Sequence, residues 1–445
     1  MSTEPHTNSQ PLPAADTTDR STAVDDGRPV HLLVTLVLVA FLFNTLGRGL
    51  TETFAVFVLP VEAALGASRA EITLTYSIYM LVHGIAAPFA GQVIDRLGAR
   101  LTYGMGLLLL GGGYVLGADA TSLTHYYLTV GVMPGLGAAF LGMVVASSLL
   151  SRWFTRGIGS MMAVPYAAVG FGVLIGPPVT QWLIETYDWR TAHAALGYAS
   201  LSLLPLLLVL PLGRITGGSP EWQTTRAATL TAGSLWTVSR AARTPAFWAL
   251  FFVYFWTALA AYSVLPQSVA FLVEQDFDPL VAAGALGISG GLSTIGIVGM
   301  GWASERFGRL RSVVVSYVIS MTGIACLLAI IWVPSLIFVY LFVLCFGLMQ
   351  GVRGPVIAAL VAILYRGGAV GSIFGALSLA LGLGAGVGSW LSGLLHDLTH
   401  DYVASFGLAI TASLFGLITY VASASLRHES LEVSPAAPDQ AQEIK

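Results

Sequence analysis

The chain has 445 residues, of which 56% are hydrophobic and 10% are charged, and its mean hydropathy is +0.79. Soluble domains carry about 25% charged residues, so this composition excludes a soluble globular protein. Neither the formal net charge of −3 nor the cysteine content points to a nucleic-acid partner, a disulfide framework or a zinc site, since both cysteines, Cys326 and Cys345, lie in apolar segments.

Long apolar segments follow a polar N-terminal tail. Residues 1–30 are rich in Ser, Thr, Asp and Pro and contain no basic region followed by an apolar one, so we expect a disordered tail without a cleavable signal. A hydrocarbon core of about 30 Å needs about 20 apolar residues per helix. Twelve segments meet this requirement, near residues 31–60, 70–93, 101–120, 124–150, 158–184, 191–211, 245–272, 280–303, 312–332, 335–364, 368–395 and 402–426.

The stretch 212–244 divides these segments six and six. It is rich in Gly, Thr and Arg, and we expect a cytoplasmic linker there between an N-terminal bundle (31–211) and a C-terminal bundle (245–426). Residues 427–445 are expected to form a second tail. The predicted fold is therefore an all-α membrane protein of twelve transmembrane helices in two six-helix bundles.

The distribution of basic residues predicts the orientation. With the N-terminus in the cytoplasm, 16 basic residues fall inside and two, Arg69 and Arg190, fall outside. This asymmetry favours two cytoplasmic termini. The two remaining arginines, Arg48 and Arg353, lie within predicted spans.

The two halves repeat each other. The loop "GQVIDRLGARL" (91–101) is echoed 210 residues later by "GWASERFGRLR" (301–311). Five positions in the fifth segment recur 212 residues later in the eleventh, namely Gly159-Ser160, Gly170, Gly172 and Gly176 against Gly371-Ser372, Gly382, Gly384 and Gly388. Such repeats are typical of secondary transporters, whose substrate site lies between the halves.

These motifs resemble the major facilitator superfamily over the whole chain. The first loop matches the G-x-x-x-D-R-x-G-R pattern, and "SRWF", "RTPAFW" and "LPVEAALGASRAEITLTYSIYMLVHGIAAPFAG" resemble the branch of monocarboxylate transporters and oxalate/formate antiporters. The resemblance implies alternating access, with helices 1, 4, 7 and 10 lining the cavity. The chain departs from the animal monocarboxylate transporters in helix 8, "GALGISGGLSTIGIVGMGW", which lacks their Asp–Arg pair.

Helices 1 and 10 carry the strongest candidates for substrate binding. Asn44, Arg48, Thr51 and Glu52 are spaced to share one helix face, and Arg353 lies at a similar depth in the opposite half. A guanidinium binds a carboxylate with two parallel hydrogen bonds, so two of them favour an anionic substrate. The alternative is that Arg48 and Glu52 neutralise each other and only position their helix.

Glu52 is the candidate proton-coupling residue. Burial raises the pKa of a carboxyl group and a nearby arginine lowers it, so its protonation could follow substrate occupancy. A permanent ion pair with Arg48 or Arg353 is an equally plausible interpretation.

Further candidates come from helices 2, 5 and 7. Tyr76, Tyr79 and His83 share a face of helix 2, and His83 could relay a proton or simply bond a neighbouring helix. Polar and aromatic residues of helices 5 and 7 could contact substrate, although single aromatic residues in a membrane bundle more often serve packing: Tyr166, Trp256, Tyr262, Ser263 and Gln267.

The resemblance implies a conformational latch in each repeated loop. The first comprises Asp95, Arg96 and Arg100, and the weaker copy comprises Glu305, Arg306 and Arg309. A simple anchoring role for these arginines is compatible with it. The Gly-rich stretch of helix 11 lacks the preceding strand and the lysine of a phosphate-binding loop, so close helix packing is the better interpretation. "GVLIGPP" loosely resembles the antiporter motif G-x-x-x-G-P and keeps exchange or efflux open.

We therefore expect proton-coupled uptake of a small organic anion, most simply a monocarboxylate, in a bacterial-type inner membrane. The alternatives are an organic-anion exchanger, an exporter of a larger aromatic acid, and a sensor that binds substrate without moving it. No enzymatic constellation, metal or cofactor is expected, and the protein is expected to be monomeric.

Overall fold

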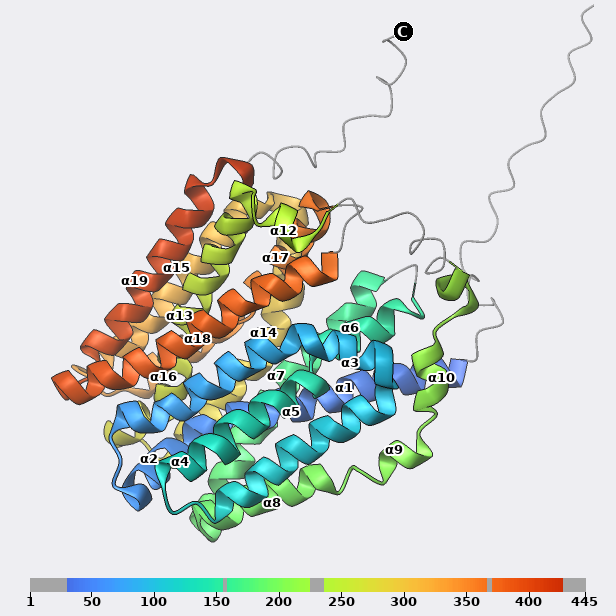
Figure 1. Ribbon diagram of the computed structural model, residues 1–445. Helices are drawn as coiled ribbons and strands as arrows, with labels where there is room; N and C mark the ends of the chain where they lie inside the picture. Colours follow the sequence, from blue (N-terminus) through green and yellow to red (C-terminus); the bar gives the residue numbers. More distant parts are fainter. Residues whose placement is uncertain (1–29, 155–157, 225–235, 366–369, 427–445) are drawn as a thin grey trace, which may run out of the picture.

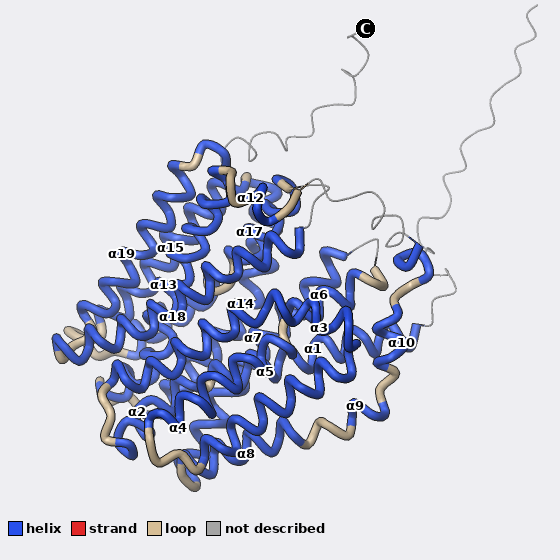
Figure 2. Tube along the Cα trace, viewed as in Figure 1, coloured by secondary structure: helices blue, strands red, loops and turns tan. Residues whose placement is uncertain are grey.

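The computed structural model describes residues 30–154, 158–224, 236–365 and 370–426. The predicted tails at 1–30 and 427–445 lie outside these residues apart from Val30, as does the 225–235 part of the linker. The described residues are almost entirely helical and contain no strand (Figure 2).

The N-terminal half packs as one group of helices and the C-terminal half as another (Figure 1). The N-terminal half comprises α1 (Val30–Glu52), α2 (Phe54–Leu65), α3 (Arg69–Ala118), α4 (Leu123–Tyr126), the π-helical turn η1 (Tyr127–Val132), α5 (Met133–Leu141), α6 (Met143–Ser151), α7 (Ile158–Thr186), α8 (Trp189–Leu201), α9 (Leu206–Val209) and α10 (Leu212–Gly217). The C-terminal half comprises α12 (Val238–Ala241), α13 (Pro245–Glu274), α14 (Pro279–Phe307), α15 (Arg309–Ala329), α16 (Leu336–Met349), α17 (Arg353–Leu364), α18 (Val370–Thr399) and α19 (Val403–Ala422).

The prediction of membrane-spanning helices is confirmed. Eleven stretches among the described residues are long and apolar enough to cross a membrane. One of them is α3, whose 50 residues would extend far beyond a core of about 30 Å if straight. Its backbone leaves the helical conformation at Gly98 (φ 78°, ψ 170°), a left-handed φ that favours glycine. The chain reverses there, so α3 holds the second and third predicted spans.

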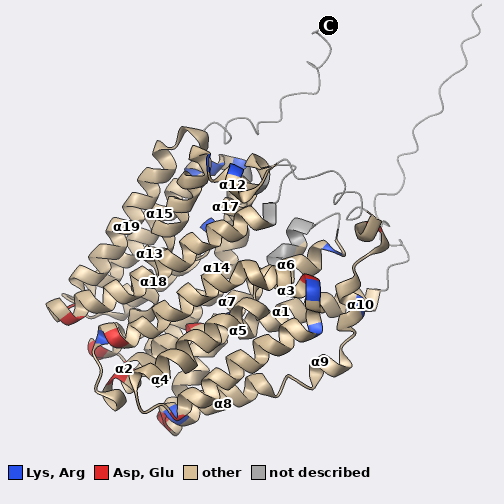
Figure 3. Cartoon of the chain, viewed as in Figure 1, with Lys and Arg blue, Asp and Glu red and all other residues tan. Residues whose placement is uncertain are grey.

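The bundle has two ends, which we call proximal and distal. The proximal end holds the start of α1 and the end of α19, whereas the distal end holds the turns at 66–68, 119–122, 187–188, 275–278, 330–335 and 400–402. Most charged residues gather near these ends, and the helix surfaces between them are largely uncharged (Figure 3). Large apolar side chains such as Ile295 and Val298 are more than half exposed on those surfaces, as expected of groups that face lipid.

Three predicted spans are interrupted within their length. Helix 1 breaks at Thr53 between α1 and α2, and helix 4 breaks at Gly142 between α5 and α6. Helix 10 breaks between α16 and α17, where Gly351 has φ +76°. Gly142 and Val352 are 210 residues apart, so helices 4 and 10 break at equivalent positions of the repeat.

The repeated glycines make equivalent contacts in the two halves. A Cβ on Gly170 would lie 2.6 Å from Gly290 O of α14, and a Cβ on Gly382 would lie 2.9 Å from Met80 O of α3. Each of these glycines therefore packs against the opposite half.

The next glycine of each repeat packs within its own half. A Cβ on Gly172 would lie 2.5 Å from Thr45 O of α1, and a Cβ on Gly384 would lie 2.2 Å from Phe255 O of α13. These approaches explain why glycine recurs there, because any side chain would separate the helices.

Part of the predicted linker is folded onto the N-terminal half. Thr216 of α10 accepts a hydrogen bond from Ala99 N at 2.9 Å, and its carbonyl accepts one from Arg152 Nη1 at 2.7 Å. The proximal surface of this half is therefore covered by the segment that leaves helix 6.

Candidate functional site

A buried ion pair on α1 forms the centre of the candidate site. Arg48 Nη2 donates to Glu52 Oε1 at 2.6 Å, and the side chains are 17% and 6% exposed. The two residues are one helical turn apart, which is the spacing that brings side chains together on one face. The structure thus contains the ion pair that the sequence analysis considered as an alternative to substrate binding by Arg48.

Three tyrosines surround this pair. Arg48 Nη2 also donates to Tyr262 Oη at 2.6 Å, and Arg48 Nη1 donates to Tyr79 Oη at 3.4 Å. Tyr76 Oη donates to Glu52 Oε2 at 2.9 Å, so both carboxylate oxygens have a donor. Tyr76 and Tyr79 come from α3, whereas Tyr262 comes from α13 of the opposite half. The pair therefore links the two halves through one phenol.

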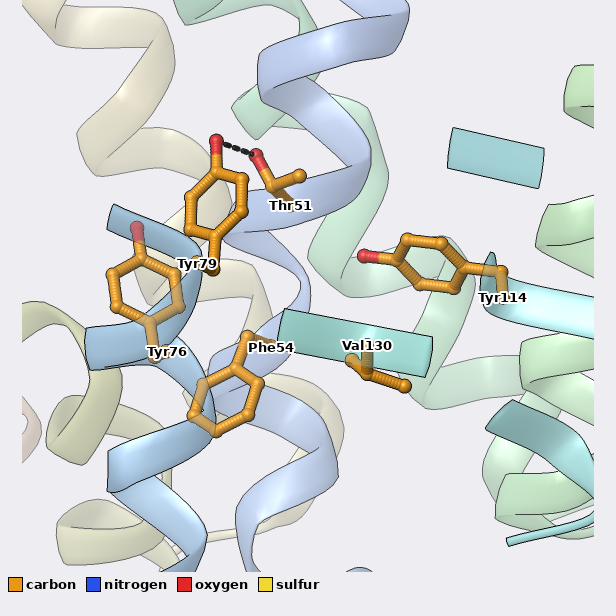
Figure 4. A pocket seen from close by; sticks show the side chains of 6 residues that line it. All are labelled: Thr51, Phe54, Tyr76, Tyr79, Tyr114 and Val130. Atoms are coloured by element: carbon orange, nitrogen blue, oxygen red, sulfur yellow. Dashed lines mark hydrogen bonds between the residues drawn. The ribbon is translucent and has the colours of Figure 1, made fainter. Parts of the chain in front are cut away.

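The break after Glu52 borders a small pocket in the N-terminal half. It is lined by Thr51, Phe54, Tyr76, Tyr79, Tyr114 and Val130, and Figure 4 shows the Tyr79 hydroxyl reaching Thr51. Tyr114 Oη donates to Leu50 O at 2.7 Å, and Thr53 N donates to the same carbonyl at 3.2 Å. This carbonyl thus gains the partners that the interrupted helix needs.

Arg353 lies apart from this centre. Its guanidinium donates to Ser316 Oγ (3.2 Å), Ser316 O (2.9 Å) and Ser320 Oγ (2.6 Å), all on α15, and stacks 4.0 Å from the Tyr317 ring centroid. The side chain is 7% exposed, and no acidic side chain pairs with it among the described residues. Among the described residues, it shares no hydrogen-bonding partner with Arg48. Arg353 is thus a buried cation held by neutral groups.

Asn44 and His83 flank the central pair on its proximal side. Asn44 is fully buried and donates from Nδ2 to Ala40 O at 2.8 Å, while its Oδ1 has no partner among the described residues. His83 stacks on Tyr79 with centroids 5.9 Å apart, and its Nδ1 is buried without a described partner. A Cβ on Gly142 would lie 3.8 Å from His83 Cε1, so this imidazole adjoins the break in helix 4.

The other predicted contact residues are dispersed. Trp256 packs on Phe415 of α19 with centroids 5.1 Å apart. Tyr166 is half-buried on α7 and makes no hydrogen bond within the described part of the chain. Ser263 donates to Leu259 O and Gly388 O, both backbone groups. Only Tyr262 of this set contacts the central pair.

The first predicted latch is organised by an arginine that the sequence analysis did not include. Arg152 Nη2 donates to Asp95 Oδ1 and, at 3.1 Å, to Ser148 Oγ, and its guanidinium lies 5.2 Å from the Trp222 ring centroid. Arg96 is exposed, and Arg100 reaches Leu210 O at 3.4 Å. Arg152 is the arginine of the "SRWF" motif, so that motif was the sequence feature that could have identified it as part of the latch.

The second latch has a different arrangement. Arg306 stacks near the rings of Trp302 (5.6 Å) and Phe307 (5.9 Å), and Arg309 Nη1 is buried without a described hydrogen-bond partner. The Glu305 side chain lies outside the described part. The two loops therefore share a sequence pattern but not the same contacts among the described residues.

A second buried arginine cluster, at the distal end, was missed. Arg69 is 1% exposed and contacts Glu62, Gln267, Glu274, Asp397 and Tyr402, which together we call the Arg69 cluster. Tyr402 also donates to Glu274 Oε2 at 2.7 Å. Burial raises the pKa of the Tyr402 hydroxyl above its usual range, so this group remains a donor at neutral pH. Gln267, predicted as a substrate contact, belongs to this cluster.

No group of His, Cys, Asp and Glu among the described residues has the arrangement of a metal site, and both cysteines are free thiols. The central chemistry is that of one ion pair, three phenols and a separate cation. Such an arrangement can bind and release an anion or a proton, because each partner of Arg48 and Glu52 is itself a hydrogen-bonding group.

Comparison with known families decides what kind of protein carries this fold. A family model described as "Major Facilitator Superfamily" matches residues 37–352. The chain belongs to the major facilitator superfamily. It is thus an integral, multi-pass membrane protein of a transporter family, and the superfamily prediction made from its motifs is confirmed.

The similar proteins within this superfamily include monocarboxylate transporters. Rat "Monocarboxylate transporter 13" is 29% identical over 276 residues, which cover 61% of this chain and 60% of the relative. Human "Monocarboxylate transporter 12" is 32% identical over 41% of this chain and 35% of its own. The chain thus spans about 60% or less of these two superfamily relatives.

A bacterial relative and a solved structure are also similar to this chain. The Escherichia coli "Uncharacterized MFS-type transporter YhjX" is 24% identical over 66% of this chain and 71% of its own. The crystal structure of a D-xylose-proton symporter aligns with a TM-score of 0.67 at 15% identity, covering 87% of this chain and 97% of that one. This last match supports the superfamily fold.

Proposed function

We propose that this superfamily member is a secondary active transporter of a small organic anion, most simply a monocarboxylate, which it takes up together with a proton by alternating access. The observation that carries the proposal is the buried Arg48–Glu52 pair, which contacts Tyr262 of the opposite half. The names of the similar monocarboxylate transporters support the substrate class.

Charge balance explains why the anion and the proton would move together. In the empty site, Arg48 and Glu52 form a neutral pair. A substrate carboxylate that takes the place of Glu52 on Arg48 leaves a second buried carboxylate, and a proton on Glu52 restores neutrality. At the Arg48–Glu52 centre itself, both the empty and the fully loaded states are therefore neutral, whereas either ligand alone leaves a net charge on this centre within the membrane, which is unfavourable. Cotransport follows from this difference.

The tyrosines would supply the remaining contacts of the substrate. Tyr262 and Tyr79 already hydrogen-bond to Arg48, so their hydroxyl groups lie where a bound carboxylate or a 2-hydroxyl group would need partners. Tyr76 would hold Glu52 in both protonation states, as acceptor to a protonated carboxyl or donor to a carboxylate. His83, stacked on Tyr79, would provide the next proton-accepting group towards the proximal end.

Arg353 would act as the second anion-attracting group. Its partners on α15 are neutral, so it contributes a positive charge to the C-terminal half that no described acid cancels. Engagement of both arginines by one carboxylate would require Arg353 to leave Ser316 and Ser320. We place the termini on the cytoplasmic side of an inner membrane from the arginine distribution, with the chain acting as a monomer.

A thermal-shift screen of the purified protein against mono-, di- and aromatic carboxylates tests the substrate class. Lactate or pyruvate is expected to stabilise the protein, and Arg353→Gln is expected to weaken that effect. Stabilisation by none of the monocarboxylates in an otherwise folded protein would contradict the proposal. Exchange in place of symport would appear as uptake that requires anion on the opposite side of the membrane and ignores the pH gradient.

A further inference from the structure

The Arg69 cluster joins the two halves at the distal end. Arg69, on α3, donates from Nη2 to Glu274 Oε1 at 2.5 Å and from Nη1 to Gln267 Oε1 at 3.1 Å, both on α13. The same Nη1 donates to Tyr402 Oη at 2.5 Å, in the turn before α19. One guanidinium thus connects the N-terminal half to two elements of the C-terminal half.

Backbone groups at the start of α3 extend this connection. Asp397 of α18 accepts from Arg69 N at 3.0 Å and from Ala70 N at 2.8 Å. These N–H groups belong to the first turn of α3, where a helix has no internal acceptor and where a carboxylate is stabilised. The C-terminal half therefore caps a helix of the N-terminal half.

The contacts between the halves continue from this cluster towards the middle of the bundle. Ser389 Oγ donates to Thr73 O at 3.2 Å and Ser77 Oγ donates to Gly386 O at 2.7 Å, along the α3–α18 interface. A Cβ on Gly393 would lie 2.9 Å from Arg69 O, so the two backbones are in close contact there. The hydrogen bond between the halves that lies nearest the proximal end within the described spans is a long one, from Thr294 Oγ1 of α14 to Ala167 O of α7 at 3.4 Å. The structure is thus closed at the distal end.

The arginine at the centre of the cluster is not repeated in the C-terminal half. The position 210 residues after Arg69 is Pro279, the first residue of α14, and this helix is capped by its own Asp278. Asp278 Oδ1 accepts from Leu280 N and Val281 N, within the same half. Among the described residues, the equivalent position in the C-terminal half therefore has no counterpart of Arg69.

We propose that the Arg69 cluster is the distal gate of the transporter, whose contacts with the C-terminal half break each time the site opens to that side. The proposal rests on the alternating access proposed above. Opening parts Arg69 from Gln267, Glu274, Asp397 and Tyr402, which all belong to the C-terminal half. Glu62 of α2 accepts from Arg69 Nε at 2.7 Å and moves with it, so the arginine keeps one ion pair in the open state.

Two features keep the closed gate from being too stable to open. The three carboxylate side chains are between a quarter and a third exposed, so their interaction with Arg69 is partly screened by water. Gln267 Nε2 and His396 Nδ1 are buried without a hydrogen-bond partner among the described residues, and water can satisfy them once the halves part. The gate is therefore specific in geometry but moderate in strength.

Glu274 and Glu62 provide a matched pair of variants. Glu274→Gln removes a charge contact that only the closed state has, so it should favour the open state. Glu62→Gln removes the contact that Arg69 retains on opening, so it should leave the closed state dominant or favour it further. Asp397→Asn weakens the cap on α3 and serves as a second gate variant.

Double electron–electron resonance can follow the gate without any substrate. Spin labels are placed at Tyr187→Cys and Trp332→Cys, two exposed distal positions in opposite halves, with Cys326 and Cys345 replaced by serine. The full-length protein in liposomes is expected to give mainly the short distance. Glu274→Gln and Asp397→Asn should each raise the ratio of long to short distances by roughly threefold or more.

Equal distance distributions in wild type and both gate variants would overturn the gate, as would the same lengthening in Glu62→Gln. Uptake of radiolabelled lactate is measured in parallel, in liposomes that contain the same proteins without spin labels. Failure of the wild type to take up lactate would count against the proposed function, while the distance comparison would still decide the gate.

Discussion

Arg48 and Glu52 lie one turn apart on α1 and share a 2.6 Å hydrogen bond inside the bundle, with Tyr262 of the opposite half bonded to the same guanidinium nitrogen. An ion pair on a membrane helix that touches both halves is placed to sense both a bound anion and the relative position of the halves. This relationship connects the proposed chemistry to the proposed motion.

Replacement of Arg48 should abolish most of the substrate affinity. Arg48→Ala removes the charged donors proposed to bind the carboxylate, a loss of about 1.5–3 kcal/mol or roughly ten- to hundredfold in binding. Isothermal titration with lactate measures this loss. Arg190→Ala removes another arginine of the same half, which bonds to Ala118 O far from the pair, and should bind lactate as wild type does. Normal affinity in Arg48→Ala would contradict the assignment.

Tyr262→Phe should weaken substrate binding less than Arg48→Ala does. It deletes the hydroxyl that joins Arg48 to α13 and preserves the ring, which should cost about 1 kcal/mol or roughly fivefold in affinity. Tyr254→Phe on the same helix is the matched control, since Tyr254 is buried and makes no hydrogen bond within the described residues. Similar lactate titrations for the two variants would argue against a specific role for Tyr262.

The glycines of the repeat should tolerate no side chain. Gly384→Ala would bring a Cβ within 2.2 Å of Phe255 O and should lower the free energy of unfolding by about 1–3 kcal/mol. Gly299→Ala, where nothing lies within 4 Å of the added Cβ, should be neutral or slightly stabilising. Thermal unfolding in detergent compares the two variants. A Gly384→Ala protein as stable as Gly299→Ala would show that the helices can separate without loss.

Arg152 should stabilise the proximal surface far more than Arg100. Arg152→Ala deletes the contacts that join Asp95, Ser148 and Thr216, and it leaves a buried site without its charged donor; we expect a loss of about 2 kcal/mol or more in stability. Arg100→Ala removes one long contact of an exposed side chain and should change stability by less than about 0.5 kcal/mol. Equal unfolding midpoints for the two variants would contradict this ranking.

Much of the fold follows from sequence because membrane burial imposes simple rules. Apolar length predicted the spans, and the glycine repeat predicted the pseudo-symmetry, since backbone contact leaves no room for other residues at positions such as Gly172 and Gly384. The sequence also identified Arg48 with Glu52, because a charge inside an apolar segment is rare. These features depend on local composition.

Long-range partners were not predictable in the same way. Arg69 was counted only as one of two arginines on the outer side of the membrane. Its burial by α13, α18 and the turn before α19 was not predicted, because its partners Glu274 and Asp397 are 205 and 328 residues distant. For Arg353 the sequence predicted a role in substrate binding but not its partners in the structure, the serines of α15. Which neighbouring helix a side chain faces depends on helix rotation, and single-sequence periodicity does not fix that rotation when all faces are apolar.

The central claim is that a carboxylate on Arg48 and a proton on Glu52 occupy the site together. The most direct test loads liposomes containing the protein with a pH-sensitive dye and adds lactate outside, with Glu52→Gln in parallel. For the wild type we predict a saturable lactate-driven acidification of the interior, with about one proton per lactate by the charge balance of the site. Glu52→Gln should exchange lactate without that acidification. Lactate uptake without proton movement in the wild type, or undiminished proton movement in Glu52→Gln, would contradict the claim.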